Sequence, residues 1–191
     1  AAGTGELRTL ADLIALARAR PAQVSVGVPS TTARAALEMV RRAAGLDLTA
    51  VPYTGSGQAL TGALRGDVAA VVDTLAGALG AIRGNQVRAL GVSLGRRSES
   101  LPDLATFREG GVDVEVDAWN AFYAPRGTPR EIIAALNAAS NAALADATVR
   151  GFVVNGGAEP MGGTPEDLAA LMRADRAKWE PVIRGLGLTA Q

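Results

Sequence analysis

Three short polar segments of this chain lie where chemistry is possible, because each follows an apolar run and begins a helical pattern. They are Ser30 to Thr32, Tyr53 to Ser56, and Asp73 with Thr74. Free backbone N–H groups, hydroxyls and the helix dipole at such a helix start attract a carboxylate or phosphate. Ordinary N-capping by Ser and Thr explains the same residues without any ligand. Both interpretations stay open here, and convergence of two such ends in one cleft would favour the ligand.

A group of acidic residues is the second candidate. Asp113, Glu115 and Asp117 alternate with valines, and this period of two places the three carboxylates on one face of a strand. A metal ion could bind there. The solvent-facing side of an amphipathic strand explains the pattern better, so we expect no metal site.

Two glycine motifs have the outline of catalytic or nucleotide sites but lack parts that such sites need. The run from Gly91 to Gly95 matches G-x-S-x-G, but the chain has no histidine to act as base and no cysteine. Gly55-Ser56-Gly57 begins like a dinucleotide fingerprint, but Leu60 stands where the third glycine belongs. We therefore expect no catalytic triad, no Cys/His zinc site, no disulfide and no nucleotide cofactor.

The composition is typical of a globular chain of one ordinary domain or two small ones. Of 191 residues, 48% are hydrophobic and 20% are charged. The 19 Lys and Arg balance the 19 Asp and Glu, which argues against a nucleic-acid partner. No apolar run reaches the roughly 20 residues of a membrane span, so no membrane insertion is expected, and the chain does not open with a signal-peptide pattern.

The first half of the chain alternates between strand and helix patterns joined by short connections. Thr9 and Asp12 predict a capping box for a helix that ends at Pro21. Such alternation predicts a parallel, doubly wound α/β sheet, whose ligands bind beyond the carboxyl ends of the strands. The predicted strands are 24–28, 48–52, 68–72 and 87–93, and the predicted helices end near residue 44 or span 58–65 and 75–83.

The last third is predicted to be mainly helical, after a short helix near Leu104–Glu109 and one long strand from Val112 to Tyr123. Thr128 and Thr164 each precede a proline and acidic residues, which predicts two capped helix starts, the second helix reaching about Arg184. The expected buried stripes are Ile132, Leu136, Ala139 and Ala143, then Leu168, Leu171, Met172, Trp179, Val182 and Ile183. Such helices need a sheet. They either pack on the first unit or belong to strands that this chain lacks.

Several blocks, in the right order, resemble the Bug/TctC-type extracytoplasmic solute receptors, the substrate-binding proteins of tripartite tricarboxylate transporters. Val51 to Ser56 resembles the family's VPYKG turn, and Arg88 to Ser93 resembles its RALAVTS segment. Further similar blocks are Thr9 to Pro21, Arg96 to Gly111, Trp119 to Pro129, Gly157 to Glu166, and Lys178-Trp179.

The resemblance implies a type II periplasmic-binding-protein-like fold with two lobes. Residues 7–115 would form a complete, doubly wound second lobe. Residues 116–191 would form the return strand and helices of an incomplete first lobe, because the first-lobe strands that open family members have no counterpart in this sequence.

The resemblance also implies small carboxylate or dicarboxylate ligands, no catalysis, a periplasmic location and membrane components of a transporter as partners. The ligand-binding residues that follow are Gly27, Ser30, Thr31, Thr32, Tyr53, Thr54, Gly55, Ser56, Asp73, Thr74, Trp119 and Asn120. Two departures from the family pattern leave the ligand unnamed: no histidine follows the loop at Gly27, and Thr54 replaces the usual lysine.

Three functions are compared. A carboxylate receptor, or a fragment of one, should be stabilised by small dicarboxylates. A one-lobe interaction module should instead bury its unpaired helix faces on another chain or in a homodimer. An enzyme would have to use the acidic cluster at 113, 115 and 117, and is the least favoured because the catalytic residue types are missing.

Overall fold

A computed structural model describes residues 1–3 and 5–187 of the chain. Two compact units are formed, Ala1–Ala118 and Trp119–Gln191, which we call unit 1 and unit 2. Unit 1 contains the sheet, and the described part of unit 2 contains helices but no strand.

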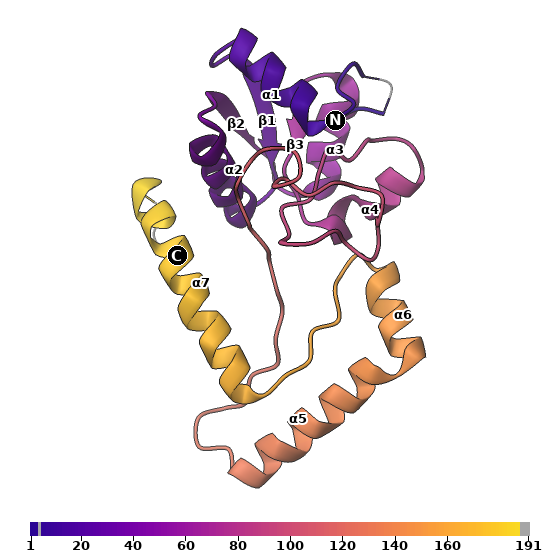
Figure 1. Ribbon diagram of the computed structural model, residues 1–191, viewed down its shortest axis with the longest axis vertical. Coiled ribbons are helices and arrows are strands. Elements are labelled where there is room, and N and C mark those ends of the chain that lie inside the picture. The colour runs from indigo at the N-terminus through magenta and orange to yellow at the C-terminus, as the bar shows by residue number, and fades with distance from the viewer. Residues whose placement is uncertain (4, 188–191) are drawn as a thin grey trace. The chain divides into compact units, whose positions relative to one another are not determined.

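The sheet of unit 1 is parallel, with β1 (Val24–Val28) between β2 (Leu48–Pro52) and β3 (Ala70–Val71) (Figure 1). Val26 is the partner of Ala50 on one side and of Ala70 on the other. Because β1 is central and paired on both edges, it is buried at four of its five positions, all except the half-buried Ser25. The predicted parallel α/β fold is confirmed.

Four helices connect and cover these strands. They are α1 (Leu10–Ala19), α2 (Thr31–Ala44), α3 (Ser56–Arg65) and α4 (Leu75–Arg83). The capping box of Thr9 and Asp12 forms as predicted. Helix α2 ends at Gly45, whose φ is 61°. Glycine adopts this left-handed conformation with little strain because it has no Cβ.

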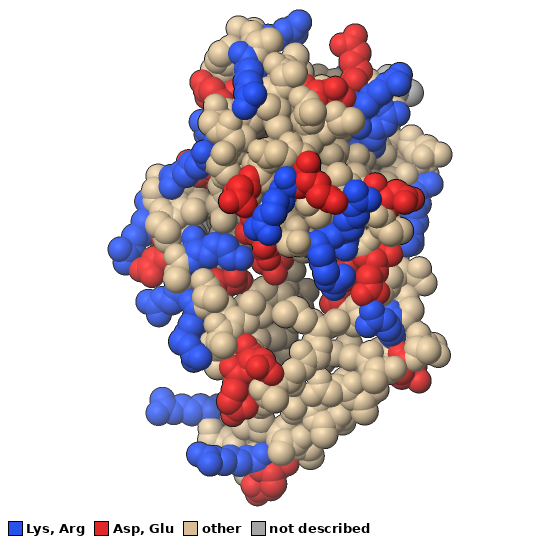
Figure 2. All heavy atoms as spheres, in the orientation of Figure 1, with Lys and Arg blue, Asp and Glu red and all other residues tan. Residues whose placement is uncertain are grey.

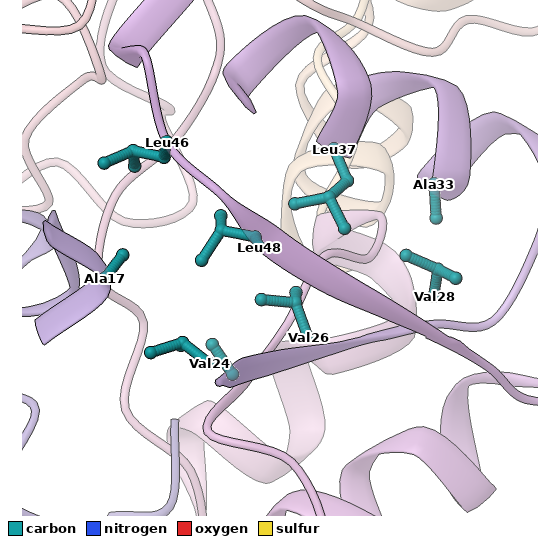
Figure 3. Close-up of a cluster of buried hydrophobic side chains, with 9 residues drawn as sticks. Ala17, Val24, Val26, Val28, Ala33, Leu37, Leu46 and Leu48 are labelled. Carbon is teal, nitrogen blue, oxygen red and sulfur yellow. The ribbon is translucent and has the colours of Figure 1, made fainter. Parts of the chain in front are cut away.

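The core lies between the sheet, α1 and α2 (Figure 3). Leu37 of α2 and Val26 of β1 are almost fully buried in it. The buried residues of this cluster are Ala17, Val24, Val26, Val28, Ala33, Leu37, Leu46, Leu48 and Ala70, of which all but Ala70 are labelled in Figure 3. This core fixes the sheet and hence the edge at which the strands end.

Three predicted elements of unit 1 differ from the structure. The strand predicted at 68–72 is reduced to Ala70–Val71. The segment 87–93 forms no strand, since Val87 and Val92 make only isolated bridges, to Ala2 and Thr106. No helix forms at Leu104–Glu109. There the Glu109 carboxylate accepts from Thr106 N, and the Thr106 hydroxyl accepts from Glu109 N, so side chains close a turn in place of helical bonds.

The long strand predicted from Val112 to Tyr123 is also wrong, although its alternation is real. Val112, Val114 and Val116 are buried while Asp113 and Glu115 are exposed. Val116 N donates to Ser93 O at 2.8 Å, but no strand ladder continues from that bond. An extended segment therefore has the period of a strand without a partner strand.

Unit 2 contains α5 (Arg130–Ala145), α6 (Ala147–Asn155) and α7 (Pro165–Gly185). The capping box of Thr164 and Asp167 starts α7 as predicted. The box predicted at Thr128 does not form, because the Thr128 hydroxyl donates to Pro125 O and the helix begins only at Arg130. Within the described chain no single helix is long and apolar enough for a membrane span, and α5 with α6 pass only as a pair bent by 76°.

The buried stripe predicted for α5 is the largest error. Ile132 is 47% exposed and Leu136 58% exposed, and no residue of α5 or α6 is buried. In α7, Val182 is buried as predicted, but Met172 and Ile183 are exposed. The helical spacing was interpreted correctly as an apolar face, but the described part of unit 2 supplies nothing to cover it.

Candidate functional site

The candidate site is the carboxyl edge of the sheet in unit 1. Because the strands are parallel and β1 is central, the ends of β2 and β3 flank the end of β1. A helix begins close after each of these ends, α2, α3 and α4 in turn. The sheet thus gathers the three polar segments at one edge, which is where open α/β sheets bind ligands.

The turn after β1 is capped by its own serine. Ser30 Oγ accepts a hydrogen bond from Ala33 N at 3.0 Å, so this hydroxyl is used by the helix. Thr31 and Thr32 form the first turn of α2 and are exposed. They leave hydroxyls at a helix N-terminus that a ligand can reach.

Gly27 and Tyr53 are in direct contact across the sheet. A Cβ on Gly27 would stand 3.1 Å from Tyr53 Cε2 and 3.2 Å from Val71 Cγ2. A Cβ on Gly62 of α3 would collide with the Tyr53 hydroxyl. The ring of Tyr53 therefore lies on two glycine positions, and this fixes the turn that follows β2.

Ser56 and Asp73, from the turns after β2 and β3, meet at the start of α4. A Cβ on Gly77 would stand 2.7 Å from Ser56 Oγ and 3.0 Å from Asp73 Oδ2. Two of the three predicted turns are therefore brought together, which sequence spacing alone left open. Glycine at position 77 keeps the space between them free.

The start of α4 is built by Asp73 and Thr74. Thr74 Oγ1 accepts from Gly77 N at 3.3 Å, and Asp73 Oδ1 accepts from Thr74 N at 2.8 Å. Asp73 Oδ2 is buried and has no hydrogen-bond partner among the described residues. Asp73 thus orients the N-terminus of α4 with Oδ1, and its Oδ2 lies beside the same Gly77 position as Ser56 Oγ.

Thr54 and Gly55 have weaker local roles. Thr54 Oγ1 lies 2.8 Å from Gln58 Oε1, and Gly55 is the N-cap of α3 without any side-chain bond. A hollow of about 400 Å³ runs along α3, lined by Tyr53, Gly57, Gln58, Thr61, Gly62, Arg65 and Asp67. Of the predicted site residues, Tyr53 alone lines it.

The helix starts at this edge share an electrostatic property. The first turns of α2, α3 and α4 contain no acidic residue, whereas those of α1, α5 and α7 contain Asp12, Glu131, and Glu166 with Asp167. The first turn of α6 also lacks an acid, but Asp146 caps that helix. An acidic side chain in the first turn offsets the positive end of the helix dipole. At the carboxyl edge no first-turn acid offsets the dipoles of α2, α3 and α4. Among the residues of the three polar turns, Asp73, just before α4, is the acidic one.

Trp119 and Asn120 belong to unit 2. Trp119 Nε1 donates to Asp175 Oδ2 at 2.5 Å, and Lys178 Nζ lies 3.1 Å from the other oxygen of the same carboxylate. Asn120 is exposed. Sequence reasoning missed Asp175, a buried acid in α7 whose only signal was its i,i+3 spacing from the single lysine.

The other motifs are used structurally. Ser93, of the G-x-S-x-G motif, donates its hydroxyl proton to Val116 O at 2.5 Å. Arg108 lies 3.1 Å from Asp113 Oδ1 and 3.6 Å from Glu115 Oε2, so two of the three acids pair with a base. Within the described residues no cluster of acids, cysteines or histidines is arranged to hold a metal.

Comparison with known proteins gives the family. The profile described as "Tripartite tricarboxylate transporter family receptor" matches residues 3–188. The chain belongs to this family. The family consists of transporter receptors, which are not enzymes, and this is the resemblance expected from the sequence blocks.

Individual relatives agree. Protein BugT of Bordetella pertussis is 33% identical over 186 residues, which are 95% of this chain and 57% of BugT. A Rhodopseudomonas palustris protein solved with adipate is 32% identical with a TM-score of 0.84, and covers 98% of this chain. MatC from the same organism, solved with bound malate, is 29% identical with a TM-score of 0.74 over 96% of this chain. The chain spans 64% of both solved chains.

Proposed function

We propose that this chain provides the second-lobe half of a receptor that captures a small carboxylate for a tripartite tricarboxylate-type transporter. Residues 7–115 are the complete second lobe, and residues 116–191 belong to an incomplete first lobe. The protein works outside the cytoplasmic membrane, in the periplasm, and needs no cofactor. Its role is to bind and present the solute, not to convert it.

The observation that carries this proposal is that three helix N-termini without first-turn acids begin at one sheet edge, where the starts of α3 and α4 come together at Gly77. Each N-terminus presents the positive end of a helix dipole and first-turn N–H groups, only some of which are bonded to the cap, and these features favour an anion. Ser56 adds a hydroxyl that has no hydrogen bond to the described residues, so it remains available to a ligand oxygen. Simple capping explains Ser30 and Thr74, but it does not explain Ser56.

The ligand class is supported by the solved relatives. One is titled with adipate and another with bound malate, and both molecules are dicarboxylates. A dicarboxylate places one anionic group on the helix N-termini of unit 1, and its second group is left for other residues. Trp119 and Asn120 of unit 2 stay proposed ligand-binding residues on the strength of the family resemblance.

The experiment is calorimetric titration of the native protein that contains these residues, with malate, succinate, adipate and citrate. Ser56→Ala removes a hydroxyl without removing a helix cap, so we expect the affinity to fall by about tenfold, which corresponds to one hydrogen bond to a charged group. The thermal unfolding of the ligand-free variant should stay unchanged.

Ser25→Ala is the matched control, because Ser25 lies near the amino end of β1, at the opposite edge of the same sheet. It should leave the affinity unchanged. The proposal is wrong if none of the four acids binds the native protein. If Ser25→Ala weakens binding as much as Ser56→Ala, the site is not at the carboxyl edge.

A further inference from the structure

The Asp73 side chain contains a hydrogen-bond acceptor that the described chain does not use. Its Oδ1 accepts from Thr74 N at 2.8 Å, but its Oδ2 is buried and has no partner among the described residues. Orientation of the α4 start therefore explains one oxygen of this carboxylate and not the other. A buried carboxylate oxygen without a donor costs free energy, because it has given up its hydrogen bonds to water. A donor from outside the chain would remove this cost.

The unused oxygen lies where the starts of α3 and α4 come together. A Cβ on Gly77 would stand 3.0 Å from Asp73 Oδ2 and 2.7 Å from Ser56 Oγ, so both oxygens border the same point. Gly77 is exposed and has no side chain to fill the space between them. A ligand group that binds at this point therefore meets Asp73 and Ser56 together.

Asp73 and Ser56 together act as an acceptor toward such a group. An ionised carboxylate only accepts hydrogen bonds, and a serine hydroxyl has a single proton to donate. When Ser56 turns that proton toward Asp73 Oδ2, the serine oxygen offers only its lone pairs to a ligand. A ligand carboxylate at this point would face a like charge, whereas a hydroxyl or ammonium group would form a charge-assisted hydrogen bond.

We propose that Asp73 and Ser56 select ligands with a hydrogen-bond donor on the carbon next to the carboxylate, namely 2-hydroxy or 2-amino carboxylates. The carboxylate binds at the helix starts without first-turn acids, and the neighbouring donor bonds to Asp73 directly or through the Ser56 hydroxyl. This inference rests on the proposed function and adds a substrate class to it.

Local contacts have to provide this selection, because the charge of the whole molecule does not. The formal net charge is zero, and positive and negative side chains are intermingled on the face that Figure 2 shows. Long-range electrostatic attraction therefore treats malate, succinate and oxaloacetate alike, since all three carry two negative charges at neutral pH. A difference in affinity among these acids comes from the group on the second carbon.

The test is calorimetric titration of the native protein with these three acids, which carry a hydroxyl, no substituent and a carbonyl at that carbon. We expect malate to bind about tenfold more tightly than succinate, which corresponds to one hydrogen bond to a charged group. Oxaloacetate should bind most weakly, because its carbonyl is a further acceptor. Aspartate tests the 2-amino group. Tighter binding than succinate by malate alone identifies a hydroxyl and by aspartate alone an ammonium group, and either result supports the proposal.

The diagnostic variant is Asp73→Asn, because the amide keeps an oxygen for Thr74 N and replaces Oδ2 with a donor nitrogen. The order should then reverse, with oxaloacetate gaining about tenfold in affinity and malate losing about as much. A purely structural role of Asp73 would weaken the binding of all these acids equally. Asp67→Asn is the matched control, since Asp67 is an exposed acid that precedes β3, at the opposite edge of the sheet. It should leave the order unchanged.

Two results would overturn the inference while leaving a carboxylate receptor in place. One is succinate binding as tightly as both malate and aspartate, and the other is an equal loss of affinity for every acid in Asp73→Asn. If circular dichroism shows that this variant does not fold, the order of affinities in the unchanged protein decides. Failure of every acid to bind the native protein would instead refute the proposed function, and this inference with it.

Discussion

Unit 1 and unit 2 both contain helices with an apolar face, but the fraction of that face that is buried differs greatly between them. Unit 1 packs α1 and α2 on a parallel sheet, and its apolar stripes are covered. In the described part of unit 2 only Asp175 and Val182 are buried. The difference is the presence of a sheet, because a helix can bury only one stripe and needs a second layer to do so. Helical periodicity thus reveals an apolar face but not what covers it.

The largest test of this contrast compares two leucines in the isolated 191-residue chain. Leu37→Ala leaves a cavity in the core of unit 1 and should lower the free energy of unfolding by about 2–5 kcal/mol. Leu136→Ala in the exposed apolar face of α5 should change it by less than about 0.5 kcal/mol. Urea unfolding followed by circular dichroism measures both. Equal losses would mean that this apolar face is covered within the chain itself.

The next test concerns the glycine contacts that hold Tyr53. Gly62→Ala should lower the free energy of unfolding by about 1–3 kcal/mol, because its methyl group meets the Tyr53 hydroxyl and ring. The double variant with Tyr53→Phe should recover part of this loss, since the hydroxyl is the nearest atom. Additive effects in this double-mutant cycle would contradict the packing of Tyr53 on α3.

In unit 2 the comparable contacts are the hydrogen bonds from the asparagines of α5, and their expected effect on stability is smaller. Asn141→Ala removes the donor to Gly163 O and the acceptor of Gly163 N, and should cost about 1 kcal/mol. Amide exchange of Gly163 should accelerate. Asn137→Ala should have the weaker effect, because Gly163 O keeps its bond from Asn141. Slower or unchanged exchange in Asn141→Ala would show that these bonds do not hold the loop.

The smallest expected effect is the loss of stabilisation by the two capping boxes as the pH falls. Hydrogen bonds from Thr164 hold the pKa of Asp167 below its ordinary value, and bonds from the backbone of Arg8 and Thr9 do the same for the pKa of Asp12. A lowered pKa means that the folded state is stabilised at pH above the ordinary value, about 3.9, and loses this stabilisation as the pH falls through the lowered pKa.

Nuclear magnetic resonance titration of the Thr164 and Thr9 amides measures this directly. Both midpoints should lie below about 3.9, and Asp167→Asn should remove the transition at Thr164 while leaving that at Thr9. A Thr164 midpoint at or above the ordinary value would show that the box of α7 does not form in solution. Such a result would leave unit 2 less ordered locally than unit 1.

Features that depend on neighbouring residues were predictable from the sequence. The capping boxes at Thr9 and Thr164, the left-handed Gly45, and strands β1 and β2 all follow from residues a few positions apart. Prediction failed where a pattern needed a distant partner. The segment 87–93 has strand composition but makes only two isolated bridges, and the turn at Thr106 is closed by Glu109 instead of becoming helical.

The candidate site divides in the same way. The sequence by itself determined that polar turns follow the strands and that the chain contains no histidine or cysteine for catalysis. Only the tertiary structure decided that Ser56 and Asp73 meet at Gly77, that the acid-free helix starts share one edge, and that no residue of α5 is buried. The physical reason is that side-chain types and periodicity are local properties, whereas strand order and burial depend on which distant surfaces are available to pack.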